Sequence, residues 1–392
     1  MTGTIVGAVG ARHQARVDRR GALQPLDTGW SLAWSIGADD RWRDPADDPT
    51  VRQQLVDAVP VVRTALRVPG GDAVEHVYGV GGTDDAVIVE VANESPAPFV
   101  LALTVRGAHQ VAVEDTTVLI DGRPALRTVR PARRWAAAAG STADVVRSGA
   151  ASSGPFPPVA DRQGRLEATF LHPVAHRTTL VAVALPGGGR DPTRTPVAAP
   201  GPGAVARGWR RHLARGLQVE LPDARLVDEL TAARASVLLA AARATVDGAD
   251  VAALEDWGFD DEAGAAWRRL GWRARRRARR RTPGRWADVT SARRDGGALL
   301  LLAARAFLAD ETGGGAVTVL PQLPPEWRGQ PVDVRGAPIR PGRLSYSLRW
   351  HSHRPALLWE APPGVQVRAP GLDPSWASAA PAGEALLDEP VL

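Results

Sequence analysis

Apolar residues recur at every second position through much of the first half of the chain. The two clearest runs are Val87, Val89 and Val91, and then Phe99, Leu101, Leu103 and Val105. A period of two places one set of side chains on one face of a strand, so both runs predict half-buried strands. The turn-rich segment 93–98 joins them. We therefore expect the two strands to pair as a hairpin.

Shorter apolar runs follow at residues 111–113, 118–120 and 178–185. Asp121-Gly122 supplies a tight turn after the second of these runs, because both residue types tolerate a positive φ angle. Many short strands separated by turns are typical of an antiparallel sandwich. The pattern predicts an N-terminal antiparallel β-sandwich over residues 1–190.

The pattern changes after a Gly- and Pro-rich linker at residues 191–204. Apolar residues then recur every three or four positions, which is the spacing of one face of an α-helix. They follow a helix start at Asp223 and are Leu226, Leu230, Ala233, Val237 and Ala241. Further helices are expected at residues 250–257, from residue 260 or 261 onward, and at 297–309. We predict a helical region over residues 205–315.

Strict alternation returns near the C-terminus, where polar residues separate Leu344, Tyr346, Leu348 and Trp350. Such a strand has one face on a core and the other face in water. Residues 355–360 and 365–367 can pair with it. The whole pattern predicts an α+β multidomain protein, in which a C-terminal β-sheet over residues 316–392 follows the sandwich and the short helical region.

The composition supports folded domains. The chain has 392 residues, of which 44% are hydrophobic and 23% are charged, so it is long enough for more than one domain. It has no cysteine, which excludes disulfides, thiolate metal sites and a cysteine nucleophile. The N-terminus lacks the basic, apolar and small-residue order of a signal peptide, and the apolar stretches are too short to cross a membrane. We expect a cytoplasmic protein with no membrane partner.

Arginine accounts for all 48 basic residues, and ten of them lie between Arg268 and Arg285 without an acidic residue among them. Guanidinium groups pair with phosphates, so the run from Arg273 to Arg281 favours an anion or nucleic-acid site as one hypothesis. Neither interleaved aromatic residues nor a known nucleic-acid motif accompanies the run, so nucleic acid is not the expected partner. A solvated helix or loop, and an altered reading frame in GC-rich DNA, are the alternatives.

Three passages carry a resemblance to a known family. The first reads GWSLAWSIGADDRW at residues 29–42, followed by VPGGD at 68–72. The second reads GLQVELPD at 216–223, and the third reads LPPEWRGQ at 323–330 with RPALLWE at 354–360. Together they resemble actinobacterial glycoside-hydrolase-like proteins, which carry an N-terminal β-sandwich, an (α/α) six-hairpin toroid and a C-terminal β-sandwich. The layout is also similar to rhamnosidase- and glucoamylase-type enzymes.

The resemblance implies a carbohydrate ligand, hydrolysis of an oligosaccharide by two carboxyl groups, and no cofactor. The helical region departs from the family pattern. A six-hairpin toroid has twelve helices of about 11–12 residues each, whereas residues 205–315 leave room for about four to six. A catalytically inactive carbohydrate-binding or scaffold relative with a truncated toroid is therefore the second hypothesis.

Acidic residues gather in one part of the helical region, with Trp257 among them. They are Glu255, Asp256, Asp260, Asp261 and Glu262. Two carboxyl groups can act as acid and base, and an aromatic ring can stack on a sugar. Asp256, Asp260 and Glu262 are therefore candidate catalytic residues, and Trp257 is a candidate substrate contact. The alternative is structural, since acids suit a helix N-terminus and Trp257 suits a core.

A second polar patch follows Trp34 in the β-rich half and consists of Asp39, Asp40, Arg41 and Trp42. In toroidal glycosidases, loops of the β-domain can border the active cleft. The resemblance therefore makes Trp34 and the four patch residues candidate substrate contacts. The alternative is an exposed turn, with the tryptophans in the sandwich core.

Two histidine pairs have spacings that could place them on a shared face. They are His172 with His176 and His351 with His353. Neither pair has a third ligand nearby in the sequence, and zinc sites have three or four protein ligands. We expect no metal and no other cofactor.

Overall fold

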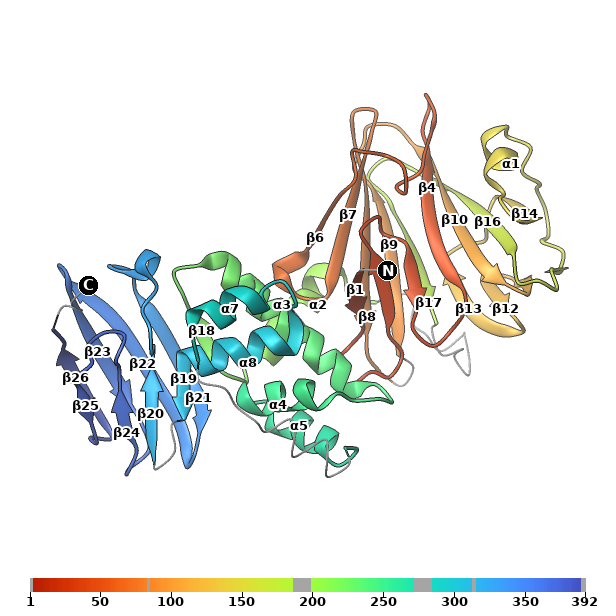
Figure 1. The fold of residues 1–392 in the computed structure, drawn as a ribbon. Coiled ribbons are helices and arrows are strands. Elements are labelled where there is room, and N and C mark those ends of the chain that lie inside the picture. Colours follow the sequence, from red (N-terminus) through yellow and green to blue (C-terminus); the bar gives the residue numbers. More distant parts are fainter. Residues whose placement is uncertain (1–2, 83–84, 186–198, 271–283, 312–314, 389–392) are drawn as a thin grey trace. The chain divides into compact units, whose positions relative to one another are not determined.

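The computed structural model describes residues 3–82, 85–185, 199–270, 284–311 and 315–388. The chain forms two compact units, Met1–Arg207 (unit 1) and Gly208–Leu392 (unit 2). Unit 1 consists mainly of strands, whereas unit 2 combines helices with strands (Figure 1). The α+β class expected from the sequence is confirmed.

The first sheet of unit 1, sheet A, has eight strands in the order β1-β2-β3-β4-β10-β16-β14, and β5 pairs with β4. Its strands are β1 (Gly3–Val6), β2 (Ala15–Asp18), β3 (Leu23–Pro25), β4 (Ser31–Gly37), β5 (Trp42–Arg43), β10 (Phe99–Ala108), β14 (Arg134–Ala139) and β16 (Leu166–Val174). All their pairings are antiparallel. The short helix α1 (Ala143–Arg147) lies between β14 and β16 in the chain.

The second sheet, sheet B, has nine antiparallel strands in the order β15-β11-β12-β13-β17-β9-β8-β7-β6. Its strands are β6 (Arg52–Leu55), β7 (Val61–Val68), β8 (Gly71–Val80), β9 (Ala86–Asn93), β11 (Gln110–Glu114), β12 (Thr117–Ile120), β13 (Arg123–Thr128), β15 (Val159–Ala160) and β17 (Thr179–Ala184), with a 3-10 turn η1 (Val56–Ala58) after β6. The predicted turn joins β12 to β13, where Asp121 and Gly122 have φ angles of 50° and 76°.

Sheets A and B share one hydrophobic core. Leu101 and Leu103 of β10 and Val89 and Val91 of β9 all belong to this core. The period-two pattern therefore identified the inward face of each strand. Unit 1 is the antiparallel sandwich that the sequence predicted.

The predicted hairpin between the two most regular runs is wrong. β9 pairs with β8 and β17 in sheet B, whereas β10 pairs with β4 and β16 in sheet A. The segment between them crosses from one sheet to the other. Asn93 is buried there, and its side chain donates to the carbonyl oxygens of Ala97 at 2.9 Å and Val174 at 3.1 Å. These hydrogen bonds give partners to backbone carbonyl groups where the chain passes from sheet B to sheet A. The alternation of apolar residues does not reveal this passage.

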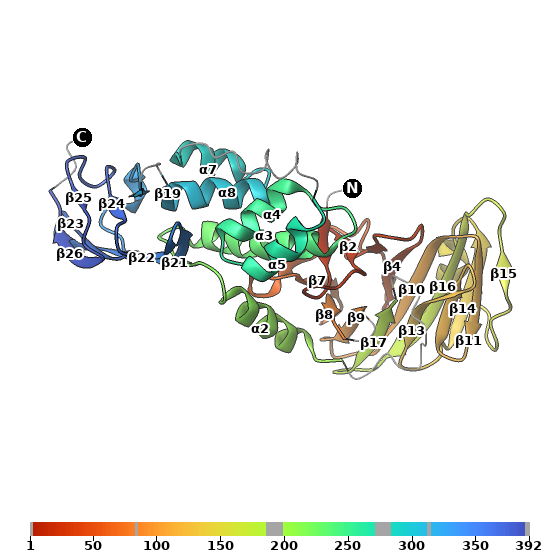
Figure 2. The same cartoon turned by 90° about the horizontal axis from the view of Figure 1, so that it is seen from below.

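Unit 2 begins within α2 (Pro202–Leu213), which spans the division between the two units. Its other described helices are α3 (Ala224–Ala242), α4 (Gly248–Asp256), α5 (Asp260–Trp267), α7 (Trp286–Ala292) and α8 (Gly297–Leu308). Helix α8 packs against α3, α4 and α7 (Figure 2). The predicted start of α3 is confirmed, because the Asp223 side chain accepts a hydrogen bond from the Leu226 N–H at 2.9 Å.

Two further sheets complete unit 2. Sheet C contains β18 (Gln218–Glu220), β21 (Val332–Ile339), β22 (Gly342–His351), β23 (Arg354–Glu360) and β26 (Ala382–Leu386) in that order. Sheet D contains β19 (Ala309–Glu311), β20 (Ala316–Val319), β24 (Gln366–Arg368) and β25 (Ala377–Ser378), and a 3-10 turn η2 (Pro325–Trp327) follows β20. Leu344, Tyr346 and Leu348 of β22 are buried, as their alternation predicted.

Strands β18 and β19 lie inside the stretch that the sequence assigned to helices. β18 pairs with β21 of the C-terminal region, and β19 pairs with β20. Each strand is only three residues long, too short to show a period. Through these pairings, the helices and the C-terminal sheets form one compact unit, and helices α3 to α8 come between β18 and β21 in the chain.

Candidate functional site

Unit 2 contains a cavity of about 750 Å³ between its helices and the start of sheet D. Helices α4, α5, α7 and α8 and strand β19 all contribute lining residues. Seven acidic residues line it against two arginines, Arg305 and Arg340. The acids are Glu255, Asp256, Asp260, Asp288, Asp295, Asp310 and Glu311. The cavity is therefore strongly acidic in the part of the chain that the structure describes.

The turn between α4 and α5 brings three of these acids together. Glu255 and Asp256 end α4, Gly258 breaks the helix with a φ angle of 79°, and Asp260 begins α5. Asp256 is the one cavity acid that is buried, with 8% of its surface exposed. Asp260 is exposed and lies 3.5 Å from the Arg343 guanidinium. Two of the predicted catalytic residues, Asp256 and Asp260, thus line the same cavity.

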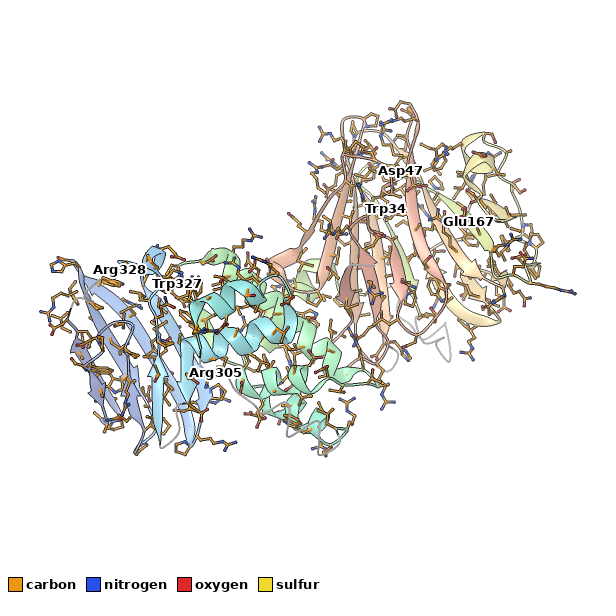
Figure 3. The ribbon with its side chains drawn as sticks, in the orientation of Figure 1. Trp34, Asp47, Glu167, Arg305, Trp327 and Arg328 are labelled. Atoms are coloured by element: carbon orange, nitrogen blue, oxygen red, sulfur yellow. The ribbon has the colours of Figure 1, made fainter. Side chains whose placement is uncertain are left out.

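Arg305, which lies in α8 (Figure 3), and Glu311 of β19 line another wall of the cavity. Arg305 is only 2% exposed, and its guanidinium donates to the carbonyl oxygens of Ala309 and Pro338. The same guanidinium lies 4.0 Å from Glu311 Oε1. Glu311 Oε2 accepts a hydrogen bond from the Arg340 N–H at 3.3 Å. Together these contacts fix the position of the Glu311 carboxylate.

Glu262, the third predicted catalytic residue, is not among the residues that line the cavity. Its Oε1 lies 3.1 Å from His212 Nε2 and accepts a hydrogen bond from Arg215 Nη1 at 3.2 Å. Burial lowers the pKa of His212, although the carboxylate of Glu262 opposes this effect. Glu262 therefore links the end of α2, and Arg215 just after it, to helix α5. Glu262 is thus separated from Asp256 and Asp260, because it faces His212 and Arg215 and does not line the cavity that they line.

Trp257 is fully buried. Its indole N–H donates to the Leu301 carbonyl at 2.9 Å, and the Arg234 guanidinium lies 5.3 Å from the ring centroid. A ring with no exposed face cannot stack on a ligand. The predicted substrate contact is therefore wrong, and the alternative of a core residue is correct.

Trp34 is also a core residue. It is 3% exposed, belongs to the shared core of the sandwich, and donates its indole N–H to the Arg20 carbonyl at 3.2 Å. Trp42 is half-buried and packs against a small apolar cluster on the other face of sheet A. Strand alternation explains the burial of Trp34, since β4 buries every second residue. Trp34 is therefore excluded as a substrate contact in this structure.

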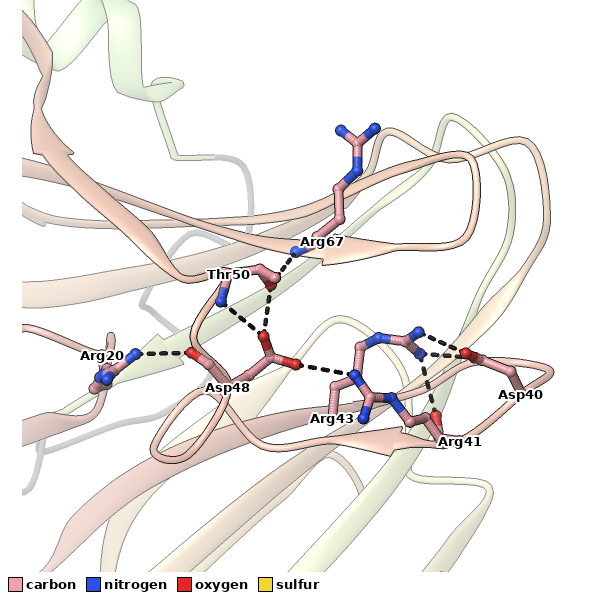
Figure 4. A network of polar contacts seen from close by, with 7 residues as sticks. All are labelled: Arg20, Asp40, Arg41, Arg43, Asp48, Thr50 and Arg67. Atoms are coloured by element: carbon pink, nitrogen blue, oxygen red, sulfur yellow. Dashed lines mark hydrogen bonds and ion pairs between the residues drawn. The ribbon is translucent and has the colours of Figure 1, made fainter.

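The polar patch around Asp39, Asp40 and Arg41 lies in unit 1, and its members Asp40 and Arg41 bind side chains of the same unit (Figure 4). Arg43 donates to both oxygens of Asp40, at 2.7 and 2.6 Å. The hydrogen bond from Arg43 is the main reason that the pKa of Asp40 falls to about 2. Asp39 is exposed.

Asp48 is the second anchor of this patch. Its carboxylate lies 3.7 Å from the Arg41 guanidinium and accepts hydrogen bonds from the Thr50 N–H and hydroxyl, at 2.9 and 2.6 Å. Arg20 donates to the Asp48 carbonyl at 2.8 Å. These contacts give the patch a structural role in holding its loop, and its members and the acidic cavity belong to different units.

The two histidines of the first pair, His172 and His176, lie in different surroundings. His172 is buried in β16, and burial lowers its pKa to about 4. His176 lies in the following loop, where its ring contacts the Ser95 carbonyl. No group of three or more metal-ligating side chains occurs in the described ranges.

The arginine run from Arg273 to Arg281 lies outside the described residues. The anion-binding hypothesis that rests on it stays a prediction. In the described part of the chain, no helix is long and apolar enough to cross a membrane.

Sequence reasoning missed four acids of the cavity and its buried arginine. They are Asp288, Asp295, Asp310, Glu311 and Arg305. A weak signal was present, since Asp310 and Glu311 come one residue after the apolar helix 297–308, which itself contains Arg305. In comparisons with known proteins, no family model matches the chain and no curated protein matches it.

Proposed function

We propose that this chain is a glycoside-hydrolase-like protein of carbohydrate metabolism, and that the acidic cavity of unit 2 binds the sugar. The observation that supports this proposal best is the cavity itself, whose volume of about 750 Å³ lies in the usual range for small-molecule sites. Carboxylates accept hydrogen bonds from sugar hydroxyls. A wall of seven acids therefore suits a ligand with many hydroxyl groups.

The cavity also offers the two carboxyl groups that glycoside hydrolysis needs. Asp256 is the cavity carboxyl best shielded from water, which suits a general acid. Glu311 is held in place by Arg305 and the Arg340 N–H, which suits a base or nucleophile that must keep one position. In this proposal Asp256 protonates the leaving oxygen, and Glu311 activates water or attacks the sugar.

Purified protein tested against a panel of aryl glycosides and oligosaccharides provides the test. We expect turnover, and we expect Asp256→Asn or Glu311→Gln to lower kcat/KM by about 10²- to 10⁴-fold. Glu384→Gln changes an exposed carboxyl of β26 and serves as the matched control, with unchanged kinetics expected. Turnover that survives both cavity substitutions would remove these residues from the mechanism.

A catalytically inactive relative is the second candidate function. One observation favours it: the described residues between 202 and 308 form six helices, half the number in a six-hairpin toroid. This candidate predicts that oligosaccharides bind without being hydrolysed, and that Glu311→Gln weakens binding measured by calorimetry. Absence of both turnover and binding across the panel would contradict both candidates.

A further inference from the structure

Unit 1 contains a buried carboxyl group, that of Glu75, with one oxygen that has no described hydrogen-bond partner. Glu75 lies in β8 and faces the core of the sandwich, with 2% of its surface exposed. Its Oε2 atom has no hydrogen-bond partner among the described residues. A buried polar atom without a partner is costly, and a buried charge without a partner is more so.

The groups around Glu75 come from several elements, and among the described residues that shift its pKa only Asp18 is charged. β2 contributes Asp18, whose carboxylate opposes ionisation of Glu75. The uncharged neighbours are Thr64 of β7 and Val91 of β9, which are its cross-strand partners, Gly21 of the β2–β3 turn, and Trp34 of β4. No Arg or His of the described chain is among the groups that shift the pKa of Glu75. Burial, followed by Asp18, raises this pKa well above its ordinary value.

The turn between β2 and β3 lies directly against this carboxyl. Gly21 has a φ angle of 91°, and a β-carbon there would collide with both Glu75 Oε2 and the Trp34 indole nitrogen. The Asp18 carboxylate closes the turn by accepting hydrogen bonds from the Arg20 and Ala22 N–H groups, at 2.7 and 3.0 Å. The position of the turn therefore depends on the Glu75 carboxyl group and the Trp34 ring, which lie against Gly21.

The same turn holds the loop that follows β5. The Arg20 guanidinium donates to the Asp48 carbonyl at 2.8 Å, and Asp48 in turn binds Thr50 and Arg41 (Figure 4). Gln53 of β6 ties the turn to the sandwich, because its amide donates to the Asp18 carbonyl at 2.7 Å and to the Thr64 hydroxyl at 3.1 Å. One chain of contacts thus runs from Glu75 through the turn to loop 44–51.

We propose that Glu75 is an alkaline-sensitive lock, which holds the β2–β3 turn and loop 44–51 in place while it is protonated and releases them when it ionises. A charged Glu75 must reach water, since no Arg or His of the described residues is among the groups that act on its charge. β8 is paired on both sides, whereas the turn carries the exposed Arg19. When Glu75 ionises, the β2–β3 turn therefore moves rather than β8, and the Arg20–Asp48 hydrogen bond breaks.

Hydrogen exchange followed by mass spectrometry on the full chain tests this proposal at pH 5 to 10, after correction for the intrinsic exchange rate. In the wild type, we expect protection of residues 16–24 and 44–51 to fall by up to about tenfold for each pH unit between the ordinary pKa of a glutamate and the raised pKa of Glu75, because opening releases one proton in this range. Glu75→Gln should remove this pH dependence. Glu94→Gln changes an exposed carboxyl of the same unit and should behave as the wild type does.

Two results would overturn the proposal. One is alkaline loss of protection that is equal in the wild type and in Glu75→Gln. The other is a result of an NMR titration of the wild type, which does not depend on whether the variant folds. The side-chain carboxyl of Glu75 can be followed by carbon NMR in glutamate-labelled protein, and titration in the ordinary range of glutamate would exclude a protonated lock.

Discussion

Polar side chains buried in unit 1 are held in very different ways. Glu167 of β16 accepts hydrogen bonds from the Thr142 N–H and hydroxyl and from Arg106, all at 2.7 Å. Burial opposes its charge, but these donors outweigh burial and lower the pKa of Glu167. His172 lies on the same strand and faces the core, and neither of its ring nitrogens has a partner among the described residues. The two faces of one strand therefore differ in the charge that they can hold.

His172 makes a prediction about acid stability. Burial, with a smaller effect of Arg130, lowers its pKa from 6.5 to about 4. The unfolded chain then binds the proton first as the pH falls. The stabilisation from a neutral His172 is complete above pH 6.5 and is lost progressively toward pH 4. We expect His172→Phe to reduce the loss of unfolding free energy between pH 7 and pH 4.5 by about 2–3 kcal/mol.

Urea unfolding at the two pH values provides this measurement. His351→Gln changes an exposed histidine of β22 and serves as the control, with the acid dependence of the wild type expected. An acid dependence that is the same in His172→Phe and in the wild type would show that His172 is not the group that titrates.

At the scale of elements, one arginine joins the start of α3 to the end of α7. Arg293 follows α7 and donates to Asp223 at 2.7 Å and to Glu229 at 2.6 Å. Asp223 is also the N-cap of α3. The Asp223 carboxylate therefore caps the N-terminus of α3 and also binds Arg293, which follows α7. These two helices are far apart in the sequence.

We expect Asp223→Ala to lower the unfolding free energy by about 1–3 kcal/mol, because it removes the cap and leaves Arg293 with one partner fewer. Chemical denaturation measures this loss. Arg225→Ala breaks the exposed pair of Arg225 with Glu229 on the same helix, and we expect a change below about 0.5 kcal/mol. Equal losses in the two variants would show that the cap contributes little.

At the scale of the whole molecule, each unit has a core built from segments far apart in the sequence. In unit 1, strand β10 is flanked by β4 and β16, and its inward leucines meet side chains of sheet B. In unit 2, residues 218–220 join the C-terminal sheet beside β21. These long-range pairings explain why the three sequence regions become two compact units.

The shared core of unit 1 allows a direct test of the sandwich. Leu103 is buried between the sheets, and we expect Leu103→Ala to lower the unfolding free energy by about 2–5 kcal/mol, because it leaves a cavity. Val129→Ala changes an exposed side chain of the same unit and should cost less than about 0.5 kcal/mol. Similar losses for the two variants in denaturation experiments would contradict the sandwich core.

The sequence by itself determined the type of most elements. The cap at Asp223, the turn at Asp121-Gly122 and the alternation along β22 depend on residues close together in the chain, so local patterns reveal them. It also identified Asp256 and Asp260 correctly as neighbours, because a short turn joins their helices.

Only the tertiary structure decided which strands pair and which acids share a cavity. β9 and β10 lie in different sheets, Glu311 lines the cavity with Asp256, and Glu262 instead binds His212 and Arg215. The physical reason is the same in each case. Such contacts depend on how whole faces of helices and sheets pack, and residues distant in the chain set that packing, so no local period encodes it.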